Sequence, residues 1–167
     1  MRTLYFAYGS NMAAGVMDRL CPGHRFLGAA QLCGHRLAFT RRSIRTGTGV
    51  ADVLRAEGHT VWGALYELDA ADLAAIDAKE GNGWAYQRRR VRVRLGPDAR
   101  ELDAHVYAVI APEATEISPA PPYLLGLLDA ARARGLPECY VAELAARRAA
   151  RSRAPRSDAR LGLELTI

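Results

Sequence analysis

Two stretches of the sequence combine residue types that could support acid–base chemistry. The first is Leu4–Met12, in which an apolar, aromatic run ends at Gly9, Ser10 and Asn11 and a helical pattern follows. Backbone N–H groups at such a strand–turn–helix junction lack intrahelical acceptors, so this turn is suited to hold a carboxylate or an oxyanion. The ordinary alternative is a buried first strand followed by an Asn helix cap.

The second stretch is Asp69–Gly81, which begins with helix-capping acids and ends at a glycine. Because residues of a helix are offset by about 100°, Glu80 lies on the same apolar stripe as Leu73 and Ile76. Burial and the negative end of the helix both disfavour an ionised carboxylate there. A carboxyl group that readily gains and loses a proton is suited to act as a general base and then as a general acid.

Other interpretations of Glu80 stay open at this point. The side chain could extend into solvent or pair with an arginine such as Arg88. Asp77 is the nearest rival carboxylate, but it falls at the edge of the stripe and could instead anchor the end of the helix.

Tyrosine hydroxyls recur close to both stretches, at Tyr8, Tyr86 and Tyr123. Each could be a core residue with one satisfied hydroxyl, but together they predict a polar-lined pocket. Ser10 lacks a GxSxG elbow and an evident activating His/Asp pair. We therefore expect it to donate a hydrogen bond rather than to act as a nucleophile.

The composition is that of one globular domain: 167 residues, half of them hydrophobic. No segment approaches the run of about 20 apolar residues that spans a bilayer, so we expect a cytoplasmic protein without membrane contact. Three cysteines without a CxxC pair and four scattered histidines predict neither a disulfide framework nor a metal site. We expect no metal and no cofactor.

The net charge of +5 raises the possibility of nucleic-acid binding. Only one of the 23 basic residues is a lysine, Lys79, which indicates a compositional preference for arginine. The arginine clusters at Arg88–Arg94 and Arg147–Arg156 are not interleaved with aromatic side chains that would stack on bases. We therefore interpret them as solvated faces and expect no nucleic-acid partner.

The pattern of elements predicts the α+β class, with a small closed or nearly closed sheet and helices around it. Strands are predicted at Leu4–Tyr8, Ala30–Phe39, Gly49–Leu54, Val61–Leu68, Tyr86–Leu95 and Leu102–Ile110. Helices are predicted at Met12–Leu20, Ala70–Lys79, Tyr123–Arg134 and Glu138–Ala150, the last two as an αα-hairpin. We expect a domain over residues 1–146 and a partly flexible Arg/Ala-rich tail over 147–167, whose end, Leu161–Ile167, is apolar enough to add an edge strand.

Several segments, in matching order, resemble the gamma-glutamylcyclotransferase family. They are Tyr5–Met12 (YFAYGSNM), Val61–Tyr66 (VWGALY), Leu73–Gly81 (LAAIDAKEG), Pro119–Tyr123 (PAPPY) and Gly135–Tyr140 (GLPECY). The similarity covers about Leu4 to Leu144. The basic segment Thr40–Gly49 and the arginine-rich tail depart from it, and the sequence assigns neither a role.

The resemblance implies a compact mixed β-barrel with flanking helices, no metal, and a small-molecule γ-glutamyl substrate. It implies that Glu80 is the catalytic proton acceptor and that the loop Tyr5, Phe6, Ala7, Tyr8, Gly9 and Ser10, with Asn11 completing the turn, binds substrate. Tyr123 would add a further contact to the substrate. We also expect Tyr86 to bind substrate, because it lies just beyond Glu80 in the sequence.

The implied reaction is intramolecular aminolysis that releases 5-oxoproline and a free amine or amino acid. An alternative is a non-catalytic module that binds γ-glutamyl ligands on the same fold. The sequence leaves open the leaving amine, the pathway and the oligomeric state, monomer or homodimer.

Overall fold

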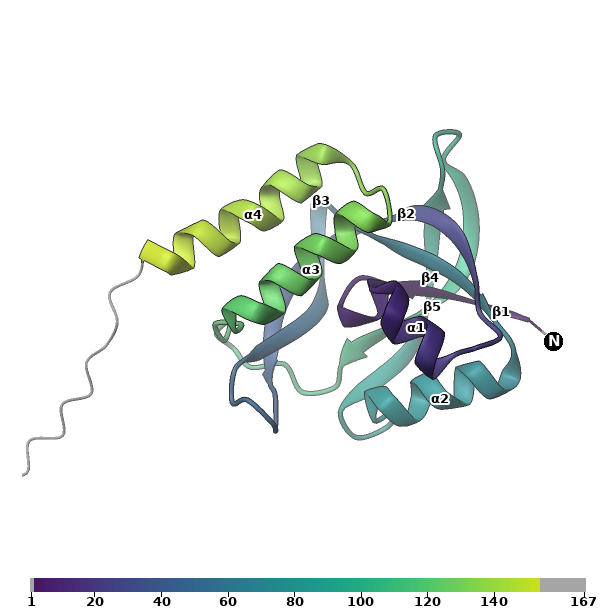
Figure 1. Ribbon diagram of the computed structural model, residues 1–167, viewed down its shortest axis with the longest axis horizontal. Coiled ribbons are helices and arrows are strands. Elements are labelled where there is room, and N and C mark those ends of the chain that lie inside the picture. Colours follow the sequence, from purple (N-terminus) through teal and green to yellow (C-terminus); the bar gives the residue numbers. More distant parts are fainter. Residues whose placement is uncertain (1, 154–167) are drawn as a thin grey trace, which may run out of the picture.

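The computed structural model describes residues 2–153, in which five strands close into a barrel in the order β1-β3-β2-β4-β5. Neighbouring strands pair antiparallel, except that β1 and β5 meet in parallel at Tyr5 and His105 and close the barrel. The predicted α+β class and mixed barrel are confirmed (Figure 1). The strands are β1 (Thr3–Ala7), β2 (Arg25–Arg42), β3 (Gly49–Leu68), β4 (Tyr86–Leu95) and β5 (Arg100–Val109).

Strands β2 and β3 form a long ribbon, and the sequence wrongly predicted two separate strands in place of β3. The segment between the predicted strands Gly49–Leu54 and Val61–Leu68 is not a turn, because β3 runs through it without a break. Gly58 lies at a positive φ of 75°, opposite a register shift between Cys33 and His35 of β2. The glycine therefore belongs to a β-bulge, which bends a strand without ending it.

The helices are η1 (Ser10–Met12), α1 (Ala14–Leu20), α2 (Ala70–Glu80), α3 (Pro121–Ala133) and α4 (Glu138–Arg153). The predicted helix from Met12 is divided, because η1 is a 3-10 turn and the extended Ala13 separates it from α1. Helices α3 and α4 lie side by side as the predicted αα-hairpin (Figure 1). Their predicted inward side chains are all buried: Leu124, Leu127, Leu128, Val141 and Leu144.

Helix α2 has the caps that its sequence predicts. The Asp69 side chain accepts a hydrogen bond from Asp72 N at 2.9 Å, and Gly81 closes the helix in the left-handed conformation. Near its C-terminal end, Asp77 accepts hydrogen bonds from Arg88 of β4 and from the Tyr107 hydroxyl of β5, both at 2.6 Å. These contacts fix the end of α2 against the barrel.

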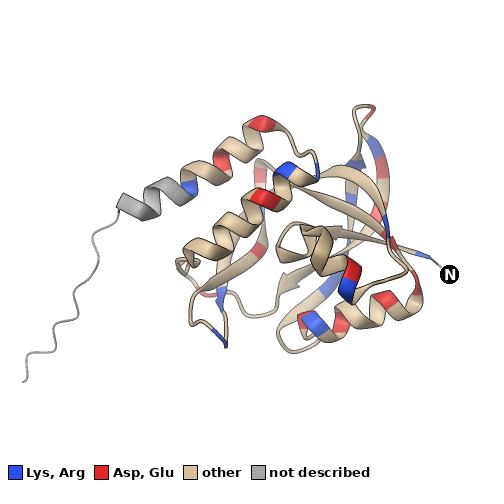
Figure 2. Ribbon diagram, viewed as in Figure 1, with Lys and Arg blue, Asp and Glu red and all other residues tan. Residues whose placement is uncertain are grey.

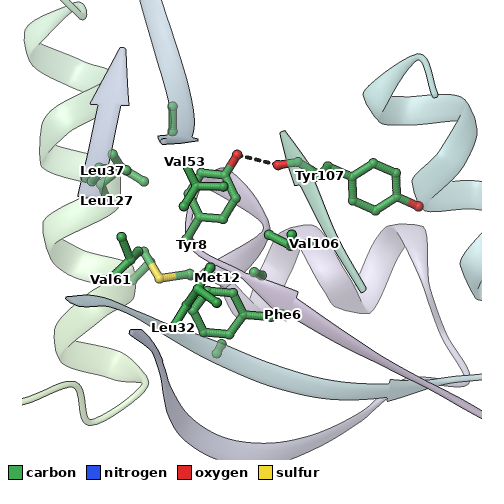
Figure 3. Close-up of a cluster of buried hydrophobic side chains, with 14 of the residues drawn as sticks. Phe6, Tyr8, Met12, Leu32, Leu37, Val53, Val61, Val106, Tyr107 and Leu127 are labelled. Atoms are coloured by element: carbon green, nitrogen blue, oxygen red, sulfur yellow. Dashed lines mark hydrogen bonds between the residues drawn. The ribbon is translucent and has the colours of Figure 1, made fainter. Parts of the chain in front are cut away.

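The barrel core begins at β1. Phe6 is fully buried and packs with Met12, Leu32 and Val61 (Figure 3). Strand β1 approaches β3 so closely that a Cβ at Gly63 would lie 2.3 Å from the Ala7 carbonyl oxygen. Glycine at position 63 is therefore required for this pairing.

The C-terminal part of the chain is described only to Arg153. Helix α4 continues past the predicted boundary at residue 147, and the division into a domain and a tail stays a prediction. The possible strand Leu161–Ile167 lies outside the described residues. From Arg2 to Arg153, no helix has the length and apolar character needed to cross a membrane.

Candidate active site

A cavity of about 340 Å³ lies between the turn after β1, the C-terminal end of α2, the β2–β3 loop and the start of α3. Of the ten predicted site residues, eight line it: Tyr5, Tyr8, Gly9, Ser10, Asn11, Glu80, Tyr86 and Tyr123. Phe6 and Ala7 do not, because their side chains are buried in the protein core. The closed barrel thus brings together residues that are far apart in the sequence, from Tyr5 to Tyr123.

Glu80 stands at the wall of this cavity with 15% of its side chain exposed. Its Oε1 accepts hydrogen bonds from Asn11 Nδ2 at 2.8 Å and from Lys79 Nζ at 2.9 Å. Among residues 2–153, its Oε2 accepts no hydrogen bond. The carboxylate is thus oriented through one oxygen, while the other stays available to a ligand.

Asn11 connects Glu80 to the first strand. Asn11 is buried, with 3% of the residue exposed. Its side-chain amide also donates a hydrogen bond to the Tyr5 hydroxyl at 2.8 Å. Lys79 makes a second connection, because its Nζ lies 3.4 Å from Ser10 Oγ. The 3-10 turn η1 therefore holds the end of α2 through side chains from both elements.

Tyr86 and Tyr123 are both held by the main chain of one residue of β3, Ala51. The Tyr86 hydroxyl donates to the Ala51 carbonyl at 3.0 Å, and the Ala51 N–H donates to the Tyr123 hydroxyl at 3.1 Å. The β2–β3 ladder is irregular here, between Ala38 and Arg41 of β2. Such an irregularity releases backbone groups from regular pairing, which explains why those of Ala51 can reach side chains.

Buried Asp52 fixes this irregular segment. Its Oδ1 accepts hydrogen bonds from the N–H groups of Val53 and Val109, at 2.7 and 2.9 Å, and its Oδ2 accepts one from the Thr40 hydroxyl. A buried carboxylate needs such partners. Asp52 therefore links β2, β3 and β5 directly behind the cavity.

The site tyrosines are protonated at neutral pH. Burial raises the pKa of Tyr123 to about 12. Burial, followed by the nearby Glu80 carboxylate, raises the pKa of both Tyr5 and Tyr86 well above the usual range. Tyr8 is similarly shifted upward in pKa by burial, and its hydroxyl donates to the Tyr107 carbonyl (Figure 3). These hydroxyls can serve as hydrogen-bonding groups but not as bases.

The turn after β1, whose residues line the cavity, contains backbone donors without a partner in the described chain. Among residues 2–153, the N–H groups of Gly9, Ser10 and Asn11 have no hydrogen-bond acceptor. A Cβ at Gly9 would lie 3.4 Å from the Ala51 Cβ and 3.7 Å from the Tyr123 hydroxyl. Any larger side chain there would fill the space beside those donors.

Sequence reasoning missed a second group of cavity residues, which comes mainly from the end of β2 and the β2–β3 loop. Arg41 and Arg42 end β2, Ser43, Ile44 and Arg45 follow in the loop, and Trp84 follows the end of α2. The basic character of Thr40–Gly49 was visible in the sequence, but its place beside Glu80 depends on barrel closure. No local pattern could have revealed that this segment and Glu80 line one cavity.

The described part of the chain offers no cluster of three His, Cys, Asp or Glu side chains arranged to hold a metal ion. The lining of the cavity supplies one oriented carboxylate, neutral phenols, backbone donors and cationic side chains. Such a set can move a proton and bind an anionic substrate group.

Known proteins resemble this chain in sequence and in fold. The family model described as "Gamma-glutamyl cyclotransferase, AIG2-like" matches residues 5–124. The human protein "Gamma-glutamylcyclotransferase" is 28% identical over 148 residues, which cover 86% of this chain and 77% of that protein. The bovine protein of the same name is 27% identical over 146 residues, with coverages of 84% and 76%. A solved structure described as "Gamma-glutamyl cyclotransferase" matches with a TM-score of 0.81 and 26% identity, over 87% of this chain and 88% of that one.

Proposed function

Because the chain belongs to the gamma-glutamyl cyclotransferase, AIG2-like, family and is thus a cyclotransferase, we propose that it converts a γ-glutamyl amide or γ-glutamyl amino acid into 5-oxoproline and a free amine. The observation that carries this proposal is the Glu80 carboxylate at the cavity wall, oriented through Oε1 and free at Oε2. A γ-glutamyl group contains its own nucleophile, the α-amine. The enzyme then needs a proton carrier but no nucleophilic side chain.

In the proposed reaction, Glu80 takes a proton from the α-ammonium group of the substrate. The freed amine attacks the γ-carbonyl carbon, and a five-membered ring closes. The protonated Glu80 then gives its proton to the leaving nitrogen as the original amide bond breaks. The ring nitrogen loses one further proton and the released amine gains one, so Glu80 ends the cycle ionised and the positive charge leaves with the amine.

The cavity supports this reaction by holding the substrate bent. The free N–H groups of Gly9, Ser10 and Asn11 are suited to bind either the α-carboxylate or the oxyanion that forms at the γ-carbon. Tyr86 and Tyr123 form part of the cavity wall, and their hydroxyls stay neutral throughout the proposed reaction. Fixing the amine near the carbonyl converts ring closure into a proximity-assisted step.

The test is release of 5-oxoproline from γ-Glu-Ala and from γ-glutamylamines by the wild-type protein and by E80Q. We expect E80Q to lower kcat by about 10²- to 10⁴-fold, the usual contribution of general acid–base catalysis. E57Q is the matched control, because Glu57 is exposed on the β2–β3 ribbon and does not line the cavity. Full activity in E80Q would refute the assigned role, and binding of γ-glutamyl compounds without turnover by the wild-type protein would refute the enzymatic function.

A further inference from the structure

The cavity has a basic rim that the proposed proton transfer does not use. Arg41 and Arg42 at the end of β2 and Arg45 of the β2–β3 loop line it together with Lys79, whereas Glu80 is its one carboxylate among the lining residues of the described chain. Figure 2 shows basic positions on the loop that joins β2 and β3. A concave site lined by one sign of charge concentrates ligands of the opposite sign.

The arginines of this rim differ in how they are engaged. Arg42 donates to the Gly47 carbonyl at 2.8 Å and so helps to hold the loop. Arg41 instead lies over the rings of Trp84 and Tyr86, with its guanidinium carbon 5.5 and 6.0 Å from their centroids. Between Arg2 and Arg153, no carboxylate forms a salt bridge with Arg41. Stacking leaves the edge of the guanidinium available for two parallel hydrogen bonds to a carboxylate.

Two large apolar side chains accompany these charges at the same cavity. Ile44 is 85% exposed and Trp84 is 66% exposed, although both line the cavity wall. The indole ring of Trp84 packs against Gly81, where a Cβ would lie 2.5 Å from the ring. Gly81 directly follows Glu80, and the Trp84 ring and the Glu80 carboxylate line the same cavity.

We propose that Arg41 and Trp84 bind the amine half of the substrate and select its chemistry. This inference rests on the proposed function. The carboxylate of the leaving amino acid binds the Arg41 guanidinium, and its apolar side chain lies on Trp84 and Ile44. The preferred substrates are then γ-glutamyl derivatives of apolar amino acids, or of peptides that begin with one. The leaving nitrogen is bonded to the γ-carbon that reacts near Glu80, so its substituent must extend toward an adjoining surface.

The decisive comparison uses γ-Glu-Phe and γ-glutamyl-2-phenylethylamide, which differ only in the carboxylate of the leaving amine. We expect the wild-type kcat/KM to be at least tenfold higher for γ-Glu-Phe. We expect R41Q to reduce kcat/KM for γ-Glu-Phe at least tenfold more than for the amide, with partial rescue in R41K. R19Q is the matched control, because Arg19 is exposed on α1 and does not line the cavity.

Different outcomes identify which statement fails. Equal losses on both substrates in R41Q would assign Arg41 to the shared γ-glutamyl half and overturn the inference. Equal wild-type kcat/KM for the two substrates would overturn it without any variant, so misfolding of R41Q cannot hide the answer. Absence of 5-oxoproline from both substrates, and also from γ-Glu-Ala, would instead refute the proposed function and with it this inference.

The apolar part of the inference has its own measurement. Wild-type protein should prefer γ-Glu-Phe to γ-Glu-Gly by about tenfold or more in kcat/KM, since the aromatic side chain leaves water when it packs on Trp84 and Ile44. W84A should reduce this preference at least threefold. An unchanged preference in folded W84A would show that Trp84 does not contact the leaving group.

Discussion

Replacing Asn11 by alanine would test whether the orientation of Glu80 matters for the proposed reaction. The Asn11 amide nitrogen lies 2.8 Å from both Glu80 Oε1 and the Tyr5 hydroxyl oxygen, and the side chain is buried. Alanine removes both donors at once. The carboxylate then keeps only the hydrogen bond from the exposed Lys79.

The magnitude follows from the two hydrogen bonds that are lost. A bond to a charged group contributes about 1.5–3 kcal/mol, and a bond between neutral groups contributes about 0.5–1.5 kcal/mol. Asn11 Oδ1 is buried without a partner in the described chain, so its removal offsets part of the loss. We expect the free energy of unfolding to fall by about 1–2 kcal/mol. If the whole Glu80 bond serves the transition state, kcat falls by about 10- to 100-fold, at about 1.4 kcal/mol per tenfold.

The assay combines urea unfolding with steady-state release of 5-oxoproline from one γ-glutamyl substrate. N82A is the matched control, because Asn82 accepts a hydrogen bond from Arg88 N but does not line the cavity. We expect N82A to lose stability with kcat within about threefold of wild type, as for a surface turn. A kcat for N11A within twofold of wild type, or an equal loss in N82A, would refute this account of Asn11.

Two further predictions concern the barrel. G63A should lower the free energy of unfolding, measured in urea, by about 1–3 kcal/mol, because the new methyl group would meet the Ala7 carbonyl. G126A is the control and should not lose stability, because a Cβ there meets nothing. Equal stability of the two variants would contradict the close β1–β3 pairing. Burial raises the pKa of Tyr66 and Tyr123 to about 12, so from about pH 10 to 12 the unfolded chain loses protons that the native state keeps. The urea concentration at the unfolding midpoint should therefore decrease as the pH is raised from 8 to 10.5. An unchanged midpoint would contradict the raised pKa values of these tyrosines.

Local signals predicted the helix that carries Glu80. The Asp69 cap and the left-handed Gly81 depend on residues only a few positions apart, and both are present in the structure. The position of Glu80 at the cavity wall follows from the same helical periodicity. Its pairing could not be predicted, because Arg88 binds Asp77 instead and Asn11 comes from a distant part of the chain.

Features that depend on strand pairing were not accessible from the sequence. Gly58 has the local character of a turn residue, but the register of β2 against β3 makes it part of a bulge. The basic end of β2 that contains Arg41 reaches the cavity only because the barrel closes. In both cases the deciding interactions join residues that no short pattern connects.

The two sides of the cavity differ in how well their hydrogen bonds tolerate mutation of the partner residues. Tyr86 and Tyr123 are fixed by main-chain atoms of Ala51, which almost every substitution at that position preserves. The partners of Glu80 are side chains, Asn11 and Lys79, and a single nucleotide change can remove either one. Loss of activity by random mutation should therefore arise more often on the carboxylate side of the cavity, while the tyrosine wall persists.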